Sequence, residues 1–159
     1  MEARGLLYID EPMLHLSEAQ VIAIADSASE LGDEGCYLSY VDRYVDPDPP
    51  IQDFAVERLS FNRYRELLDR ATLTHVLVSQ HGRWGVFVTD EGVAVVAGPE
   101  TFVASAYRTL PPMREQATRY ASDILSTELP GLHAWLRDLV NGILGPEDAA
   151  TVLSSAESP

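Results

Sequence analysis

The sequence predicts an α+β fold in which helices pack against an antiparallel sheet built on a three-strand meander at about residues 75–98. Two observations lead to this prediction. The stretch from His75 to Gly98 contains three short runs rich in β-branched and aromatic residues, separated by glycine-containing turns. The C-terminal third carries apolar residues at helical spacing on both sides of a Pro-Gly break, which predicts an αα-hairpin there.

The first turn of the meander contains His81 and Gly82. If these are the two central residues of a tight turn, Leu77 lies opposite Val86 on the neighbouring strand. Histidine tolerates a positive φ, so its position in such a turn is acceptable.

The second turn contains Glu91 and Gly92, and its length decides which face the last strand presents. A two-residue turn places Val88 opposite Val95, whereas a three-residue loop exchanges the two faces of that strand. We prefer the two-residue turn. Both faces of the meander are then apolar, so the sheet needs cover on each side, from helices, from further strands or from a second subunit.

The N-terminal third predicts one strand, one helix and a second strand. Residues 5–9 read as a short strand. Ser17 and Gln20 form a capping-box pattern, and apolar residues follow at helical spacing until a glycine ends the helix. The run 36–45 fits a helix or a strand, and its tyrosine and valine content favours a strand.

The middle of the chain predicts a loop, a strand and a second helix. Three prolines within residues 46–50 cannot continue a regular element. Residues 53–59 follow as a strand, and Ser60 or Asn62 then caps a helix with one apolar face.

The C-terminal part is predicted to be mainly helical. Residues 100–110 fit a helix or a fourth strand about equally well. A helix then runs from Pro112 to about residue 126, and the strongest amphipathic pattern of the chain covers 132–144. A short turn is expected over 147–153. The whole is expected to form one domain over residues 1–153, with a disordered tail at 154–159.

Composition limits the class of protein. The chain has 159 residues, a single cysteine and no lysine, so Cys36 cannot form an internal disulfide or a cysteine-based zinc cage. The arginine-only usage indicates a GC-rich bacterial genome. No apolar run reaches the roughly 18 residues that span a membrane, and no leader pattern is present, so we expect a soluble protein of the cytoplasm.

The charge is strongly acidic and unevenly distributed. The net charge is −14, and residues 1–57 alone carry 13 acids against two arginines. Such a field disfavours direct contact with nucleic acid or with an anionic membrane, and it favours a basic protein partner as well as simple solubility. An Asp- and Pro-rich loop flanked by tyrosines is the most acidic stretch. The candidate partner-binding residues are Tyr40, Asp42, Tyr44, Asp46, Asp48, Asp53 and Trp84.

The histidines give a weaker, alternative ligand site. The meander brings His75 close to the turn that holds Asp90 and Glu91, where a histidine and two carboxylates could bind a metal weakly or relay a proton. His81 lies at the other end of the same strand, roughly 20 Å away at about 3.3 Å per residue, so it cannot join them. No nucleophile elbow, phosphate loop or metal-ligand spacing occurs, so no catalytic residue, metal or cofactor is expected.

Three functional hypotheses follow. The first is a non-catalytic, acidic interaction protein of a bacterial cytoplasm, of the inhibitor or immunity type, which binds a basic protein partner by complementary charge and shape. The second is a small enzyme or ligand-binding domain with a pocket between sheet and helices, which would use His75 with Asp90 or Glu91, or the arginines of the second helix, Arg63, Arg65 and Arg70. The third is a homo-oligomeric structural subunit, such as a homodimer, which would cover the apolar faces of the meander.

Overall fold

A computed structural model describes residues 2–10, 15–43, 53–68 and 72–157 of the chain, and it confirms the α+β class. The elements in chain order are β1 (Glu2–Tyr8), α1 (Glu18–Glu30), β2 (Cys36–Arg43), β3 (Asp53–Val56), α2 (Phe61–Leu67), β4 (Thr72–Ser79), β5 (Gly85–Val88), β6 (Val93–Pro99), α3 (Glu100–Ala106), α4 (Met113–Leu125), α5 (Pro130–Leu144) and α6 (Pro146–Ala156).

The strands form one six-stranded sheet in the order β1-β6-β5-β4-β2-β3, and every neighbouring pair is antiparallel. The predicted meander is β4-β5-β6 at the centre of this sheet. The three N-terminal segments that were expected as strands all join it, β1 beside β6 and the β2-β3 pair beside β4. The choice of a strand for β2 is therefore confirmed.

The first turn of the meander keeps the predicted register but has a different length. Leu77 pairs with Val86, as expected. The loop, however, has four residues, because the N–H group of Ser79 donates to the carbonyl of Trp84 at 2.9 Å. The hairpin is therefore closed by Ser79 and Trp84, and not by Gln80 and Arg83. Lengthening the loop by one residue at both ends leaves the pairing unchanged.

The second turn corrects the predicted register. Val88 lies opposite Ala94, not opposite Val95, and Val86 lies opposite Val96. The loop has three residues, closed by a hydrogen bond from the Thr89 N–H group to the Val93 carbonyl at 3.0 Å, and its last residue is a glycine with φ +77°. A left-handed glycine at this place is typical of three-residue hairpin loops, so the face of the last strand is the opposite of the preferred prediction.

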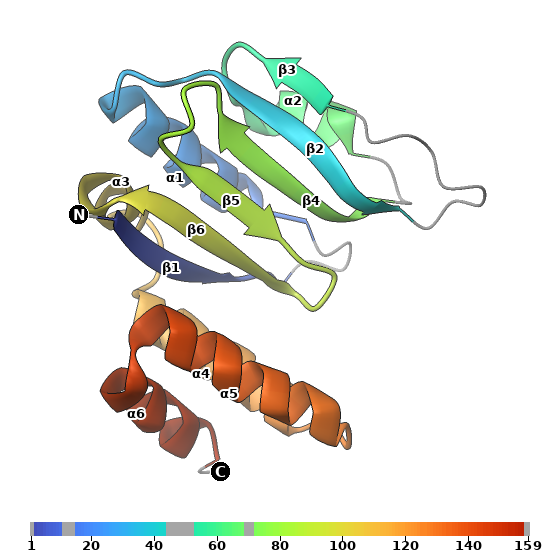
Figure 1. Cartoon of the computed structure of the whole chain (residues 1–159), viewed down its shortest axis with the longest axis vertical. Helices are drawn as coiled ribbons and strands as arrows, with labels where there is room; N and C mark the ends of the chain where they lie inside the picture. Colours follow the sequence, from blue (N-terminus) through green and yellow to red (C-terminus); the bar gives the residue numbers. More distant parts are fainter. Residues whose placement is uncertain (1, 11–14, 44–52, 69–71, 158–159) are drawn as a thin grey trace.

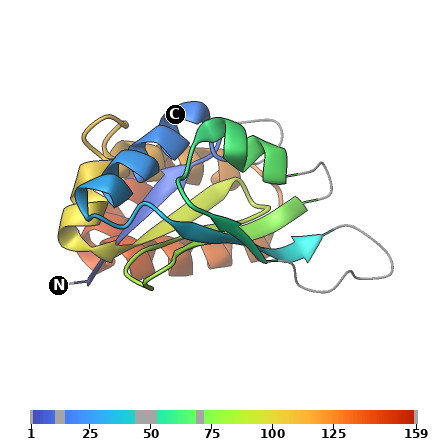
Figure 2. The ribbon, with the colours of Figure 1, turned by 90° about the horizontal axis from the view of Figure 1, so that it is seen from above.

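Helices lie on both sides of the sheet. Figures 1 and 2 show α1, α2 and α3 against one face, while α4, α5 and α6 lie on the other side, next to β1. Two hydrophobic cores result, and consecutive residues of β1 serve both: Leu7 packs under α1 and α3, and Leu6 packs under the C-terminal helices. The C-terminal helices reach β1 and the start of β6, and the rest of that face is not covered by any described element.

Side-chain caps mark the starts of α1 and α2. The side chain of Ser17 accepts from the Gln20 N–H group, and the side chain of Gln20 accepts from the Ser17 N–H group, which confirms the capping box of α1. Ser60 caps α2 by accepting from the Arg63 N–H group at 3.3 Å. The open choice at 100–110 resolves to a helix over Glu100–Ala106, and Phe102 of this helix is buried against the indole of Trp84.

The C-terminal helices are three rather than two. The predicted pair is α4 and α5, but the segment expected as a short turn belongs to α6, which packs on both of them and extends to Ala156. Ala149 and Val152 are the buried residues of α6, and their three-residue spacing is the signal that marks this helix. Among the described residues no helix is both long and apolar enough to cross a lipid bilayer.

Candidate functional site

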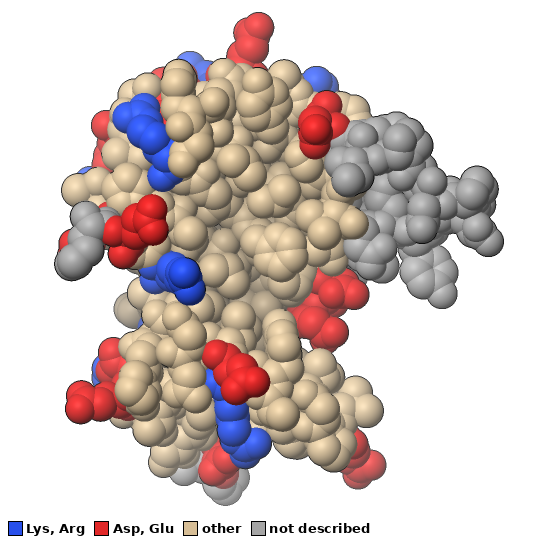
Figure 3. All heavy atoms as spheres, in the orientation of Figure 1, with Lys and Arg blue, Asp and Glu red and all other residues tan. Residues whose placement is uncertain are grey.

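The uncovered part of the sheet is the most prominent surface of the described chain. Four large apolar side chains stand on it: Tyr37 and Val41 of β2, Val78 of β4 and Phe87 of β5 are 44%, 57%, 37% and 40% exposed. We call these four residues the open sheet face. Figure 3 shows this side of the molecule, where uncharged side chains fill the centre and charged ones lie mainly at the periphery.

The strand register makes the open sheet face continuous. Tyr37 lies opposite Val78, and Val78 lies opposite Gly85, which has no side chain to cover it. One step along, Val76 lies between Ser39 and Phe87. Directly opposed side chains in antiparallel strands are in contact, so Tyr37, Val76, Val78 and Phe87 form an apolar surface across three strands, beside the polar Ser39. Val41 lies at the register shift between Tyr40 and Asp42 and has no directly opposed residue.

Carboxylates lie around one end of this surface. Asp53 on β3 is exposed and accepts a hydrogen bond from the Ser39 hydroxyl at 2.5 Å. Asp90 and Glu91 in the β5-β6 loop are exposed, and neither forms an ion pair with a described residue. This end of the open sheet face therefore combines apolar area with free negative charge.

The structure buries two of the residues predicted to contact a partner. Tyr40 is a core residue, and its hydroxyl donates to the carbonyl of Leu67. Trp84 is 3% exposed, stacks on Phe102 at 5.3 Å between ring centres, and donates its indole N–H to the Asp33 carbonyl. Both side chains face α1, α2 and α3, opposite to the open sheet face, so neither is available to a partner.

The remaining predicted contact residues are only partly described. Tyr44, Asp46 and Asp48 lie outside the described residues, as does the side chain of Asp42. Asp53 remains, next to the open sheet face. The four residues of the open sheet face were not among the contact residues predicted from the sequence. The alternation of valines in β4 was the signal that could have found them.

The alternative site around His75 is not assembled in the described structure. His75 is fully buried, its Nε2 lies 2.9 Å from the Tyr64 hydroxyl, and its ring meets that of His15 at 5.8 Å. Burial, with a smaller contribution from His15, lowers the pKa of His75 to about 3, so the ring is neutral. Asp90 and Glu91 are exposed and make no recorded contact with it.

The described residues contain no metal site. In the part of the chain that the structure describes, no group of three or more His, Cys, Asp and Glu side chains is placed to hold a metal ion.

A buried carboxylate links the β4-β5 turn to the end of α1. The side chain of Asp33 is inaccessible to solvent and accepts from the Ser79 hydroxyl, His81 Nδ1 and Arg83 Nε at 2.7, 2.7 and 3.1 Å. Burial raises the pKa of this carboxyl, but the three hydrogen bonds outweigh that effect and lower the pKa below its usual value.

The Asp33 cluster contains serine, histidine and aspartate but does not have the geometry of a nucleophilic triad. In a triad the serine hydroxyl contacts the histidine, whereas here both Ser79 and His81 contact the aspartate. The hydroxyl oxygen of Ser79 also accepts from the backbone N–H group of Arg83 at 2.9 Å. These contacts hold the turn in place, which the sequence did not predict because Asp33 lies far from it along the chain.

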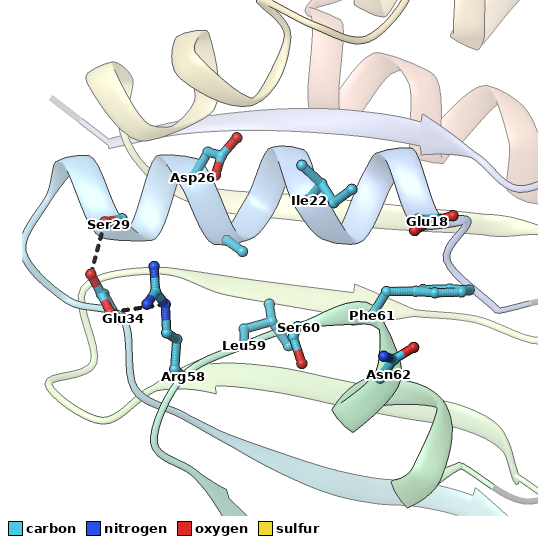
Figure 4. Close-up of a pocket in the computed structure, with 11 residues that line it drawn as sticks. Glu18, Ile22, Asp26, Ser29, Glu34, Arg58, Leu59, Ser60, Phe61 and Asn62 are labelled. Carbon is cyan, nitrogen blue, oxygen red and sulfur yellow. Dashed lines mark hydrogen bonds and ion pairs between the residues drawn. The ribbon is translucent and has the colours of Figure 1, made fainter.

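A second surface is the groove between α1 and the segment from Arg58 to Asn62, with a volume of about 320 Å³ (Figure 4). Glu18, Ile22 and Asp26 of α1 form one wall. Leu59 lies between the walls, and Phe61 lies opposite Glu18. The groove is therefore apolar at its base, with the Glu18 carboxylate beside Phe61 and the Asp26 carboxylate at the outer edge of α1, pointing away from the 58–62 segment (Figure 4).

Comparison of the chain with protein-family models, with curated proteins and with solved structures finds no significant match.

Proposed function

We propose that this chain is a non-catalytic, acidic protein-interaction protein, of the inhibitor or immunity type, which binds a basic protein partner in a bacterial cytoplasm. The observation that carries the proposal is the open sheet face: four large apolar side chains on three neighbouring strands, left uncovered beside helices that cover the rest of that side.

Apolar area of this kind supports binding to another protein. Exposure of a continuous apolar surface to water is unfavourable in free energy, and such surfaces mark sites of protein interaction. Aromatic side chains are enriched at the centre of interfaces, where they bury much area at a small entropic cost. Tyr37 and Phe87 have this character, and both are positioned by a sheet whose other face is fully packed.

The charge supports a basic partner. The chain carries a net charge of −14, and the exposed carboxylates of Asp53, Asp90 and Glu91 stand at one end of the open sheet face. A partner with an apolar centre and arginine or lysine at its rim complements this arrangement. Charges at a rim act mainly on the rate of association and on specificity, so binding is expected to weaken as salt is added.

The test compares the wild type with two serine variants. Phe87→Ser removes an aromatic side chain from the open sheet face, and Leu129→Ser removes a similarly exposed apolar side chain from the connection between α4 and α5. The wild-type chain is immobilised and used to capture proteins from an extract of the source bacterium. The captured proteins are identified and purified, and each is titrated against the wild type and the two variants. We expect a basic protein whose dissociation constant rises about tenfold or more with Phe87→Ser and stays unchanged with Leu129→Ser.

Two outcomes would contradict the proposal. Recovery of this chain alone, together with a dimer in sedimentation that Phe87→Ser dissociates, would show that a second copy covers the open sheet face. A purified partner that binds the Phe87→Ser variant as tightly as the wild type would show that the face is not the binding surface.

A further inference from the structure

We propose that the groove between α1 and α2 is a second binding site, separate from the open sheet face, which takes an extended basic segment of a partner protein with the pattern basic–x–apolar–x–basic. The inference does not depend on the function of the open sheet face, which belongs to the other side of the sheet.

The wall formed by α1 alternates charge and apolar area at a regular spacing. Glu18, Ile22 and Asp26 follow one another at steps of four residues, which is about 6 Å per step along a helix. Ile22 is 47% exposed, although the helix buries its other large aliphatic residues. Glu18 and Asp26 form no hydrogen bond or ion pair with any described residue. The exposed wall therefore offers one apolar side chain, Ile22, with one free carboxylate on each side of it.

An extended segment matches this spacing. Every second side chain of an extended chain points to the same side, and these side chains repeat about every 7 Å. A residue pattern of basic, apolar and basic at alternate positions would therefore place its apolar side chain on Ile22 and its two cations near Glu18 and Asp26. The aliphatic stems of arginine or lysine would lie along the apolar base of the groove, while their charged ends remain in solvent.

The chain itself shows how the groove accommodates a guanidinium group. At one end Arg58 extends toward α1, where its Nε lies 3.4 Å from the carboxylate of Glu34. The same carboxylate accepts a hydrogen bond from Ser29 of α1 at 2.8 Å. At the opposite end Glu18 faces Phe61, and no cation of the described residues lies on the Glu18 carboxylate (Figure 4). The guanidinium carbon of Arg65 lies 6.0 Å from the centre of the Phe61 ring. A partner's arginine would supply there what Arg58 supplies at the first end.

Net charge works in the same direction as shape. The residues that line the groove include three carboxylates and one arginine, so the site keeps an excess of negative charge after its internal ion pair is counted. An acidic or purely apolar segment would leave these carboxylates without partners. The charge therefore selects a basic segment, and Ile22 selects one that also carries an apolar residue.

The experiment uses an acetylated and amidated seven-residue peptide in which arginine, leucine and arginine alternate with serine. Binding to the whole chain is followed through backbone amide resonances. We expect the largest shift changes over residues 18–30 and 58–62. Replacing the leucine of the peptide by serine keeps its charge, and we expect this to weaken binding about fivefold, because the contact with Ile22 is lost.

The protein variants separate a seated segment from attraction between opposite charges. Glu18→Gln and Glu115→Gln both remove one exposed carboxylate from the first turn of a helix, but only Glu18 lines the groove. We expect about fivefold weaker peptide binding with Glu18→Gln and less than about twofold with Glu115→Gln. Ile22→Ser in the protein should weaken binding of the leucine peptide as much as replacing the leucine of the peptide by serine does.

Three outcomes would overturn the inference. Equal weakening by Glu18→Gln and Glu115→Gln would show that only net charge attracts the peptide. Shift changes centred on other residues would place the peptide elsewhere, and equal affinity of the leucine and serine peptides would remove the role of Ile22. Phe87→Ser should leave peptide binding unchanged, so failure of this site and failure of the open sheet face can be told apart.

Discussion

The hydroxyl oxygen of Tyr64 lies 2.9 Å from Nε2 of His75, and both side chains are fully buried. The same oxygen accepts from the Leu16 N–H group at 3.0 Å, so the tyrosine hydroxyl is held between Leu16 and the ring of His75. This contact joins α2, β4 and the start of α1, and it makes the stability of the fold sensitive to acid.

We expect acid to destabilise the fold through His75. Its pKa is about 3 in the folded chain against about 6.5 when unfolded, so the stabilisation is complete above pH 6.5 and is lost as the pH falls toward 3. In that window the free energy of unfolding should fall by about 1.4 kcal/mol per pH unit from this residue. His75→Gln keeps an acceptor for Tyr64 but does not titrate. Urea unfolding at pH 7 and pH 5 should show a smaller difference for the variant, and an equal difference would contradict the assignment.

The Asp33 cluster should contribute strongly to stability. Asp33→Asn removes the charge that accepts from Ser79, His81 and Arg83, and we expect the free energy of unfolding to fall by about 2 kcal/mol or more. Asp138→Asn on α5 is the control, because Asp138 is exposed and forms no contact with a described side chain. Thermal unfolding of both variants measures the difference, and similar melting temperatures would show that the cluster is not a stabilising contact.

Two glycine-to-alanine changes should act in opposite directions. A Cβ at Gly5 would lie 2.7 Å from the Tyr107 ring, which is held by a hydrogen bond to the Leu6 carbonyl, so we expect Gly5→Ala to cost about 1–3 kcal/mol. Nothing lies within 4 Å of a Cβ at Gly142 on the exposed side of α5, and Gly142→Ala should stabilise by about 0.5–1 kcal/mol. Denaturant titration should show this opposite pair of signs, and a stable Gly5→Ala variant would count against the tight contact.

The single thiol should be unreactive in the folded chain. Burial, with a smaller effect of the nearby Asp33 carboxylate, raises the pKa of Cys36 to about 12, so almost no thiolate exists at neutral pH. We expect an aromatic disulfide reagent to label the native chain only at the rate at which it opens, and to label it at once in concentrated denaturant. Fast labelling under native conditions would contradict the burial of β2 against the helices.

The fold class was predictable because local patterns and global structure agree over most of the chain. The meander, the capping box at Ser17 and the amphipathic run of α5 each carry a signal within a few residues of the feature that they determine. The register of β6 was predicted wrongly, because the two turn lengths differ by one residue and no residue in the turn distinguishes them. Thr89, whose hydroxyl donates to the Val93 carbonyl, stabilises the longer loop only once that loop has formed.

The candidate site was less predictable, because it depends on what does not cover the sheet. The apolar character of both faces was correctly inferred from the alternation in β4 and β5, but which face the C-terminal helices would cover depends on their packing on β1. Trp84 and Tyr40 are large aromatic residues beside polar turns, a context that fits an interface or a core equally well. Contacts with Phe102 and Leu67, distant in sequence, decide for the core.

The position of β1 between the two cores has a practical consequence for handling this protein. Leu6 and Leu7 point to opposite sides, so deleting the first eight residues would open both cores at once, whereas α6 packs mainly on α4 and α5 among the described elements. Affinity tags and fluorophores are therefore better attached after α6, and shortened versions of the chain should retain its beginning.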